Sequence, residues 1–190
     1  MGAADCYIQT LEDFALDLGG AQRDYDALVF YNMHGEPPGP PNSPRRKKIQ
    51  AVLDGLGETS QGIFVLHHAV LAFREMDTWS DVCGIADRRF KFFEGETVNV
   101  EVADRDHPIA QGLENWTMVD ETYQMNDAGE GSHVLLTTNH PKSMRTIGWT
   151  RRHGNARVFC FVCGHDNQAF ANPNFQTVVS RGIQWCAGRI

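Results

Sequence analysis

Apolar residues recur along this chain in two arrangements, short continuous runs and helical repeats. The runs have the length and composition of strands; they lie at residues 26–31, 62–66, 97–102, 116–123, 134–138, 146–150 and 157–162, with a further short strand expected at 4–8. Apolar residues three and four apart predict helices at 11–18, 49–56, 70–73, 76–82 and 175–187. Gly19-Gly20 is expected to end the first helix. Ser43 and Pro44 are typical of an N-cap and a first helical residue for the second.

The order of these elements predicts an α/β fold. The early strands alternate with helices, which is typical of a parallel sheet, whereas the later strands follow one another closely, which is typical of an antiparallel extension. We therefore expect a mixed, mainly parallel sheet flanked by helices. No repeat or linker divides the chain, so residues 1–190 are expected to form a single domain.

The charge balance narrows the possible partners. The net charge is −7, which argues against nucleic acid or an anionic membrane surface, because both require a basic face. The basic run Arg45–Lys48 reads as a solvated helix surface. No apolar stretch has the length of a membrane span, and no signal peptide is visible. With five scattered cysteines, we expect a cytoplasmic protein with reduced thiols.

Two of the predicted strands end in histidine. Residues 62–66 lead into His67-His68, and residues 157–162 lead into Gly164-His165-Asp166. In open α/β folds, sites lie beyond the carboxyl ends of strands, so one shared pocket is expected. Imidazole titrates near neutrality and is a common metal ligand, which favours acid/base or metal chemistry. The alternative is one buried and one surface histidine in the pair.

Two further polar motifs could contribute to this pocket. His107 follows a strand in a polar turn and could reach the pocket, or could serve the turn alone. In Asp120-Glu121-x-Tyr123, the alternation of a strand places Glu121 and Tyr123 on one face and Asp120 on the other. A carboxylate beside a phenol can bind sugar hydroxyls or move protons. Ordinary polarity of an exposed strand is the alternative.

Several common chemistries lack their motifs. Cys160 and Cys163 lie on opposite faces of one strand and have no second Cys-x-x-Cys, which indicates core cysteines rather than a zinc knuckle. There is no Gly-x-Ser-x-Gly, no Gly-x-Gly-x-x-Gly after a strand and no P-loop. Ordinary serine hydrolases, Rossmann dehydrogenases and P-loop NTPases are therefore not favoured.

Five motifs in order resemble the ThuA-like (trehalose utilisation) family over roughly residues 24–188. They are Gly62-Ile-Phe-Val-Leu-His67-His68-Ala69, His107-Pro108-Ile109-x-x-Gly112-Leu113, Asp120-Glu121-x-Tyr123, Trp149-x-x-x-x-Gly154 and Arg157-Val-Phe-x-x-x-x-Gly164-His165. The resemblance implies a fold similar to class I glutamine amidotransferases, which is flavodoxin-like. Those enzymes carry a cysteine at a strand-to-helix elbow, where this chain has His67-His68-Ala69. Glutamine hydrolysis is therefore not expected.

The resemblance also implies an activity, the processing of trehalose-related or 3-keto disaccharides in bacteria. Elimination, hydrolysis or isomerisation of a keto sugar needs a general base and an electrophile, for which a divalent metal such as zinc is a candidate. The catalytic candidates are His67, His68, Glu121 and His165, with Glu121 as the base and His67 and His165 as possible metal ligands. The substrate-binding candidates are Trp79, His107, Asp120, Tyr123, Trp149 and Asp166. The tryptophans, Trp116 included, are suited to stacking on sugar rings, although core packing is the more common role for each alone. A non-catalytic carbohydrate-binding or regulatory protein is the alternative.

The chain departs from the family pattern at its start. Residues 1–20 resemble the region of the family's second strand, so the family's first strand and helix are expected to be absent. An unpaired sheet edge invites pairing with another copy of the chain, and we expect a homo-oligomer.

Overall fold

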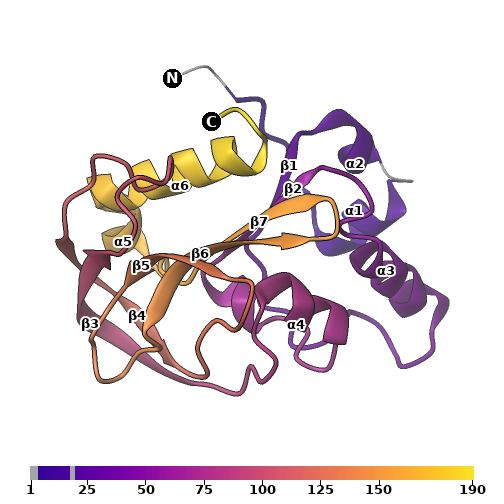
Figure 1. Ribbon diagram of the computed structural model, residues 1–190. Helices are drawn as coiled ribbons and strands as arrows, with labels where there is room; N and C mark the ends of the chain where they lie inside the picture. The colour runs from indigo at the N-terminus through magenta and orange to yellow at the C-terminus, as the bar shows by residue number, and fades with distance from the viewer. Residues whose placement is uncertain (1–3, 18–19) are drawn as a thin grey trace.

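The computed structural model describes residues 4–17 and 20–190 and shows an α/β fold built on one mixed sheet (Figure 1). The seven strands are arranged in the order β1-β2-β7-β6-β5-β3-β4. Their bounds are β1 Ala27–Phe30, β2 Gly62–Leu66, β3 Lys91–Val102, β4 Trp116–Gln124, β5 His133–Thr137, β6 Thr146–His153 and β7 Ala156–Phe161. Seven of the eight expected strands are thus confirmed, although β3 begins earlier than its alternating segment.

The eighth expected strand, at residues 4–8, is not formed. This segment is irregular, and Tyr7 and Ile8 are exposed rather than packed against a neighbouring strand. Its apolar residues therefore do not belong to the sheet. As a result, β1 is an edge strand in the order of the sheet.

The expectation of a mainly parallel sheet is wrong. Only the pairs β1–β2 and β2–β7 are parallel, and the remaining pairs are antiparallel. The reason lies in the connections, because parallel strands need a crossover of a dozen or more residues. The β6–β7 connection is only Gly154-Asn155, with Gly154 at a φ of +55°, and such a turn permits only an antiparallel hairpin.

Helices cover both faces of the sheet. Their bounds are α1 Leu11–Leu16, α2 Gly20–Asp24, α3 Pro44–Asp54, α4 Asp77–Cys83, α5 Asn167–Ala171 and α6 Pro173–Cys186, with a 3₁₀ helix at His67–Leu71. In Figure 1, α6 lies along one face of the sheet and α4 lies on the other. The predicted helical piece at 70–73 is replaced by the 3₁₀ helix, and α2 was not predicted. Residue 19 of the expected Gly19-Gly20 stop lies outside the described residues, and Gly20 begins α2.

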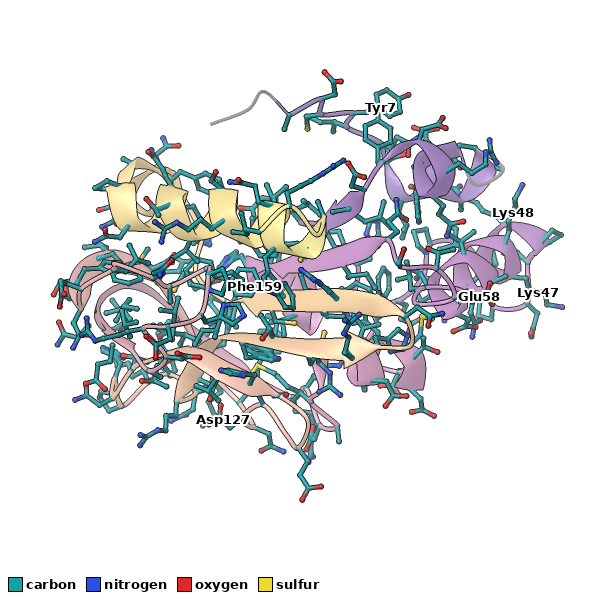
Figure 2. All side chains as sticks on the ribbon, turned by 45° about the horizontal axis from the view of Figure 1, so that its top comes forward. Tyr7, Lys47, Lys48, Glu58, Asp127 and Phe159 are labelled. Carbon is teal, nitrogen blue, oxygen red and sulfur yellow. The ribbon has the colours of Figure 1, made fainter. Side chains whose placement is uncertain are left out.

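Local sequence signals explain where several helices begin. Ser43 caps α3, because its Oγ accepts a hydrogen bond from the Arg46 amide at 3.2 Å, and Pro44 is the first helical residue, as predicted. The basic side chains Lys47 and Lys48 point away from α3 into solvent (Figure 2). The buried residues of α6 recur three or four positions apart and so form one stripe that faces the sheet; they are Phe175, Val178, Gly182 and Cys186.

The core between α6 and the sheet is closely packed. A Cβ at Gly182 of α6 would come within 2.5 Å of the ring of Phe159, the β7 residue labelled in Figure 2. Phe64 and Phe159 meet across β2 and β7 with ring centroids 4.8 Å apart. This packing fixes the carboxyl ends of β2 and β7 beside one another.

No helix within residues 4–17 and 20–190 is long and apolar enough to cross a membrane.

Candidate functional site

Three side chains from distant parts of the sequence converge at the carboxyl ends of β2 and β7. They are His67 after β2, Glu121 on β4 and His165 after β7, and one ligand atom of each lies within 4.8 Å of the others. Oε2 of Glu121 is 3.3 Å from Nε2 of His67 and 3.5 Å from Nδ1 of His165. His67 is fully buried, whereas the His165 side chain is 38% exposed, so solvent reaches the group at His165. We refer to His67, Glu121 and His165 as the His–Glu cluster.

His67 is held at a sharp turn from strand to helix. It is the first residue of the 3₁₀ helix and has a φ of +52°, a region that is costly for a residue with a Cβ. Its Nδ1 lies 2.8 Å from the carbonyl oxygen of Val162. Because a carbonyl only accepts, Nδ1 carries a hydrogen, and Nε2 is the nitrogen that faces Oε2 of Glu121.

Tyr123 orients the carboxylate of Glu121 through a hydrogen bond. Its hydroxyl donates to Oε2 of Glu121 at 2.6 Å, and the phenolic oxygen is 2.9 Å from Nε2 of His67. Burial, followed by the hydrogen bond to Glu121, raises the pKa of Tyr123 far above its ordinary value. The phenol therefore stays protonated and acts as a donor. This pairing also confirms that Glu121 and Tyr123 share one face of their strand.

Glu121 is the negative charge of the cluster. Burial alone would raise the pKa of Glu121, but hydrogen bonds from His67 and Tyr123 and the charges of His67 and His165 lower it below the ordinary value. The single phenolic proton of Tyr123 is donated to Glu121, so Tyr123 does not donate to Nε2 of His67. Two imidazole nitrogens and one carboxylate oxygen thus face one another, a donor set that suits a divalent cation.

Asp120 positions the loop that carries His165. Its Oδ2 accepts from the Gly164 amide at 2.7 Å and its Oδ1 accepts from the His165 amide at 2.9 Å. Burial raises the pKa of Asp120, and these backbone hydrogen bonds act against that rise. Gly164 has a φ of +125°, which allows the chain to turn His165 toward Glu121. Both carboxylate oxygens are engaged within the protein, so Asp120 orients a ligand atom rather than a substrate.

His68 lies beside the cluster without joining it. Its ring centroid is 4.9 Å from that of His67, and its Nδ1 is 3.2 Å from the carbonyl oxygen of Asn32. Nδ1 therefore donates, and the lone pair of the neutral ring is on Nε2. Burial, and then the charge of His67, lowers the pKa of His68. The structure thus places a neutral imidazole next to the His–Glu cluster.

The tryptophans have the more common of the two roles open to them, because they lie in the core and do not form a sugar-stacking surface. Trp79 and Trp149 are fully buried, and their indole N–H groups donate to the carbonyl oxygens of Ala69 and Cys83, each at 2.9 Å. Trp116 is buried as well. Sequence reasoning could not separate the two roles, because an indole is equally suited to a core and to a sugar-binding surface.

His107 and Asp166 serve other structural roles. The His107 ring packs 5.4 Å from Trp185, whose ring carries the guanidinium of Arg157 at the beginning of β7. The His–Glu cluster lies beyond the other end of β7, so His107 does not reach it. Asp166 is the N-cap of α5, with its carboxylate accepting from the amides of Gln168 and Ala169.

Two aromatic residues at the cluster were missed by sequence reasoning. Tyr31 follows β1 directly, and its hydroxyl donates to the carbonyl oxygen of Gly164 at 2.9 Å, while its ring centroid is 4.5 Å from that of His68. Phe170 of α5 lies 6.2 Å from Tyr31 between ring centroids. The signal for Tyr31 was available, since it ends the apolar run at 26–31 and so marks a third strand end at the site.

A separate hollow of about 400 Å³ lies beside α4, away from these residues. Asp77, Asp81, Glu130 and Arg151 are among its lining residues, and no member of the His–Glu cluster lines it. Its described lining contains no histidine or cysteine, so its chemistry is that of a charged surface depression. The convergent imidazoles and carboxylate make the His–Glu cluster the better candidate site.

Comparisons with known proteins bear on the family and the fold. The model of the ThuA family, described as trehalose utilisation, matches residues 11–186. A ThuA-like protein from Parabacteroides merdae superposes with a TM-score of 0.70 at 22% identity, over 96% of this chain and 76% of its own. One from Bacteroides uniformis gives 0.67 at 17% identity, over 94% and 75% of the two chains. A GMP synthase component from Thermoplasma acidophilum gives 0.53 at 10% identity, over 94% and 79%, which supports the amidotransferase-like fold. No significant match was found among curated proteins.

Proposed function

The chain belongs to the ThuA (trehalose utilisation) family, and from this premise we propose that it is an enzyme that processes trehalose-related or 3-keto disaccharides at the His–Glu cluster. The observation that carries the proposal is the convergence of His67, Glu121 and His165 within 4.8 Å, with one histidine open to solvent. The exposed imidazole of His165 lets a ligand reach the cluster from solvent. The amidotransferase reaction is not part of the proposal, because the elbow residue is His67 and Cys83 is buried in α4.

The cluster fits a catalytic divalent metal. Two histidines and one carboxylate are the protein ligands of many catalytic zinc sites, which keep a further position for water or substrate. The neighbours fit as well, since Nδ1–H of His67 is bound by the Val162 carbonyl and Glu121 is bound by Tyr123, as outer partners of metal ligands commonly are. When bound, such a cation would supply Lewis acidity toward a sugar carbonyl oxygen.

His68 is the better candidate for the general base. Oε2 of Glu121 is already contacted by Tyr123, His67 and His165, whereas the Nε2 lone pair of His68 is set by the hydrogen bond from Nδ1 to Asn32. We therefore prefer His68 to Glu121 in this role. The base takes the proton from the carbon next to the keto group, and the C–H electron pair forms an enolate. In an elimination, those electrons expel the glycosidic oxygen, which takes the proton. In an isomerisation, the proton returns to a neighbouring carbon of the enolate.

The test is turnover of 3-keto-trehalose by the purified chain, compared with three variants. His68→Gln and Glu121→Gln should each lose at least 100-fold in kcat/KM, because a positioned base contributes about 10² to 10⁴ in rate. His140→Gln, a histidine that pairs with Glu96 on another part of the surface, should match the wild type. Binding of the sugar without turnover by the wild type would indicate the carbohydrate-binding or regulatory alternative. Full activity in both His68→Gln and Glu121→Gln would refute the assignment.

A further inference from the structure

We propose that Tyr31 and Phe170 form a stacking platform for a pyranose ring beside the His–Glu cluster, an inference that rests on the proposed function. The two residues come from the end of β1 and from α5, and their side chains are 44% and 43% exposed. Their ring centroids are 6.2 Å apart with planes inclined by 79°, so the two rings meet edge to face and present differently oriented surfaces. Tyr31 and Phe170 thus take the sugar-stacking role that was considered for the tryptophans, which are buried in the core.

Both rings are fixed in place. The Tyr31 hydroxyl donates to the carbonyl oxygen of Gly164, in the loop that carries His165, so its ring cannot swing away without losing this bond. The Phe170 ring packs against the buried Phe175, with centroids 5.0 Å apart, and its amide donates to the Asp166 carbonyl. Rings that are ordered before the ligand arrives lose little freedom on binding, which favours affinity.

The platform lies next to the polar groups that a sugar needs. The Tyr31 ring centroid is 4.5 Å from that of His68 and 6.3 Å from that of His67. Phe170 follows the exposed His165 by five residues and belongs to α5, which packs against β4, the strand of Glu121. A ligand on the platform therefore lies against aromatic rings that are themselves next to imidazoles and a carboxylate.

This combination selects for a ring with one apolar face and a polar rim. A pyranose presents axial C–H groups on its face, which pack on aromatic rings, and hydroxyls around its edge, which hydrogen-bond to histidine and carboxylate. Sites for small molecules commonly combine aromatic walls with a few convergent polar groups. An acyclic polyol offers the hydroxyls without the flat face, so the platform distinguishes the two.

The contrast with Phe92 supports a specific role. Phe92 is also exposed, at 56%, but it lies on β3 and pairs in register with Tyr123 on the strand rather than beside the exposed His165. It is therefore the matched control, an exposed phenylalanine outside the platform. Tyr7 is exposed too, but it stacks on Tyr25 near the N-terminus.

The experiment measures binding and turnover in four variants. Trehalose, 3-keto-trehalose and the acyclic polyol sorbitol are titrated calorimetrically into wild type, Phe170→Leu, Phe170→Tyr, Tyr31→Leu and Phe92→Leu. Leucine keeps apolar volume and removes the flat face, so we expect Kd and KM for both disaccharides to rise five- to twentyfold in the two platform leucine variants. Phe170→Tyr should keep wild-type affinity, Phe92→Leu should match the wild type, and weak sorbitol binding should not change. Thermal unfolding of each variant verifies that it is folded.

The outcomes separate this inference from the proposed function. If the wild type binds sugar without turning it over, and Phe170→Leu and Tyr31→Leu bind it more weakly, the platform is supported and the enzyme is refuted. Turnover by wild type with unchanged KM in Phe170→Leu and Tyr31→Leu would support the enzyme and overturn the platform. A wild type that binds neither disaccharide would overturn both.

Discussion

The hydroxyl of Tyr123 donates to Oε2 of Glu121 at 2.6 Å, and its oxygen lies 2.9 Å from Nε2 of His67. One phenol thus orients the carboxylate and borders the buried imidazole of the same cluster. Removing it by Tyr123→Phe would leave the ring packing intact and Glu121 without its donor. We expect metal affinity and kcat/KM to fall about 10- to 100-fold, as for other outer partners of metal ligands. Metal titration and steady-state kinetics would reveal this, and unchanged values would show that the phenol is structural only.

A divalent metal should depend on all three members of the His–Glu cluster. After loading with zinc, the wild type should retain it through gel filtration, while His67→Ala and His165→Ala should not. Elemental analysis measures the retained metal, with His140→Gln as the control for a histidine elsewhere. Chelation should also lower the Tm of the wild type, because a ligand that binds only the folded state stabilises it. Equal metal in wild type and both alanine variants would place the metal elsewhere or show that its binding is nonspecific.

Asp120→Asn should impair His165 without touching the substrate. An amide offers one acceptor, whereas Asp120 accepts from both the Gly164 and the His165 amides. One buried N–H is then left without its acceptor, at a cost of about 1–3 kcal/mol in the free energy of unfolding. Urea denaturation measures the loss, and metal affinity should fall in parallel. Asp166→Asn is the matched control, since asparagine is as good an N-cap as aspartate.

Acid should weaken the fold in part through Asp104. Its carboxylate accepts from the Asp106 amide and pairs with His133 at 2.7 Å; these contacts hold the pKa of Asp104 below its usual value. A carboxyl whose folded pKa is lowered contributes stability above its unfolded pKa of about 3.9, and this contribution is lost as the pH falls through the folded pKa. The difference in unfolding midpoint between wild type and Asp104→Asn should therefore shrink below about pH 4. A difference that is constant from pH 7 to pH 3 would contradict this.

Association of two copies through the outer edge of β1 is the expectation drawn from the sequence. None of the described residues pairs with this edge, and Val29 within the strand is about half exposed. A lysine at an edge strand opposes pairing with another strand, so Val29→Lys should convert an oligomer to a monomer. Light scattering after gel filtration measures the mass. A monomeric wild type at high concentration would refute the expectation.

The site was predictable where it depends on strand ends. The strand preceding His67 and the strand preceding His165 are continuous apolar runs, and the alternation of β4 fixes Glu121 and Tyr123 on one face. These are local signals, and the carboxyl ends of neighbouring parallel strands necessarily meet.

What the sequence could not provide are contacts between distant elements. The burial of Trp149 depends on α4 lying beneath β6, where the Cys83 carbonyl meets the indole N–H. The role of Asp120 depends on a loop more than forty positions away along the chain. The antiparallel extension follows from the close spacing of the later strands, as predicted, but the share of parallel pairs was overestimated, because all pairs among β3, β4, β5, β6 and β7 are antiparallel.

The positive φ of His67 lowers the stability of the fold at a position where the imidazole belongs to the His–Glu cluster. A residue other than glycine in this region costs on the order of 1–3 kcal/mol, whereas glycine adopts it freely. Directed evolution for heat resistance alone would therefore be drawn to this turn and would relax it at the expense of the imidazole. A screen for robust variants of this protein therefore needs a second criterion that detects His67, such as metal retention or the proposed sugar turnover.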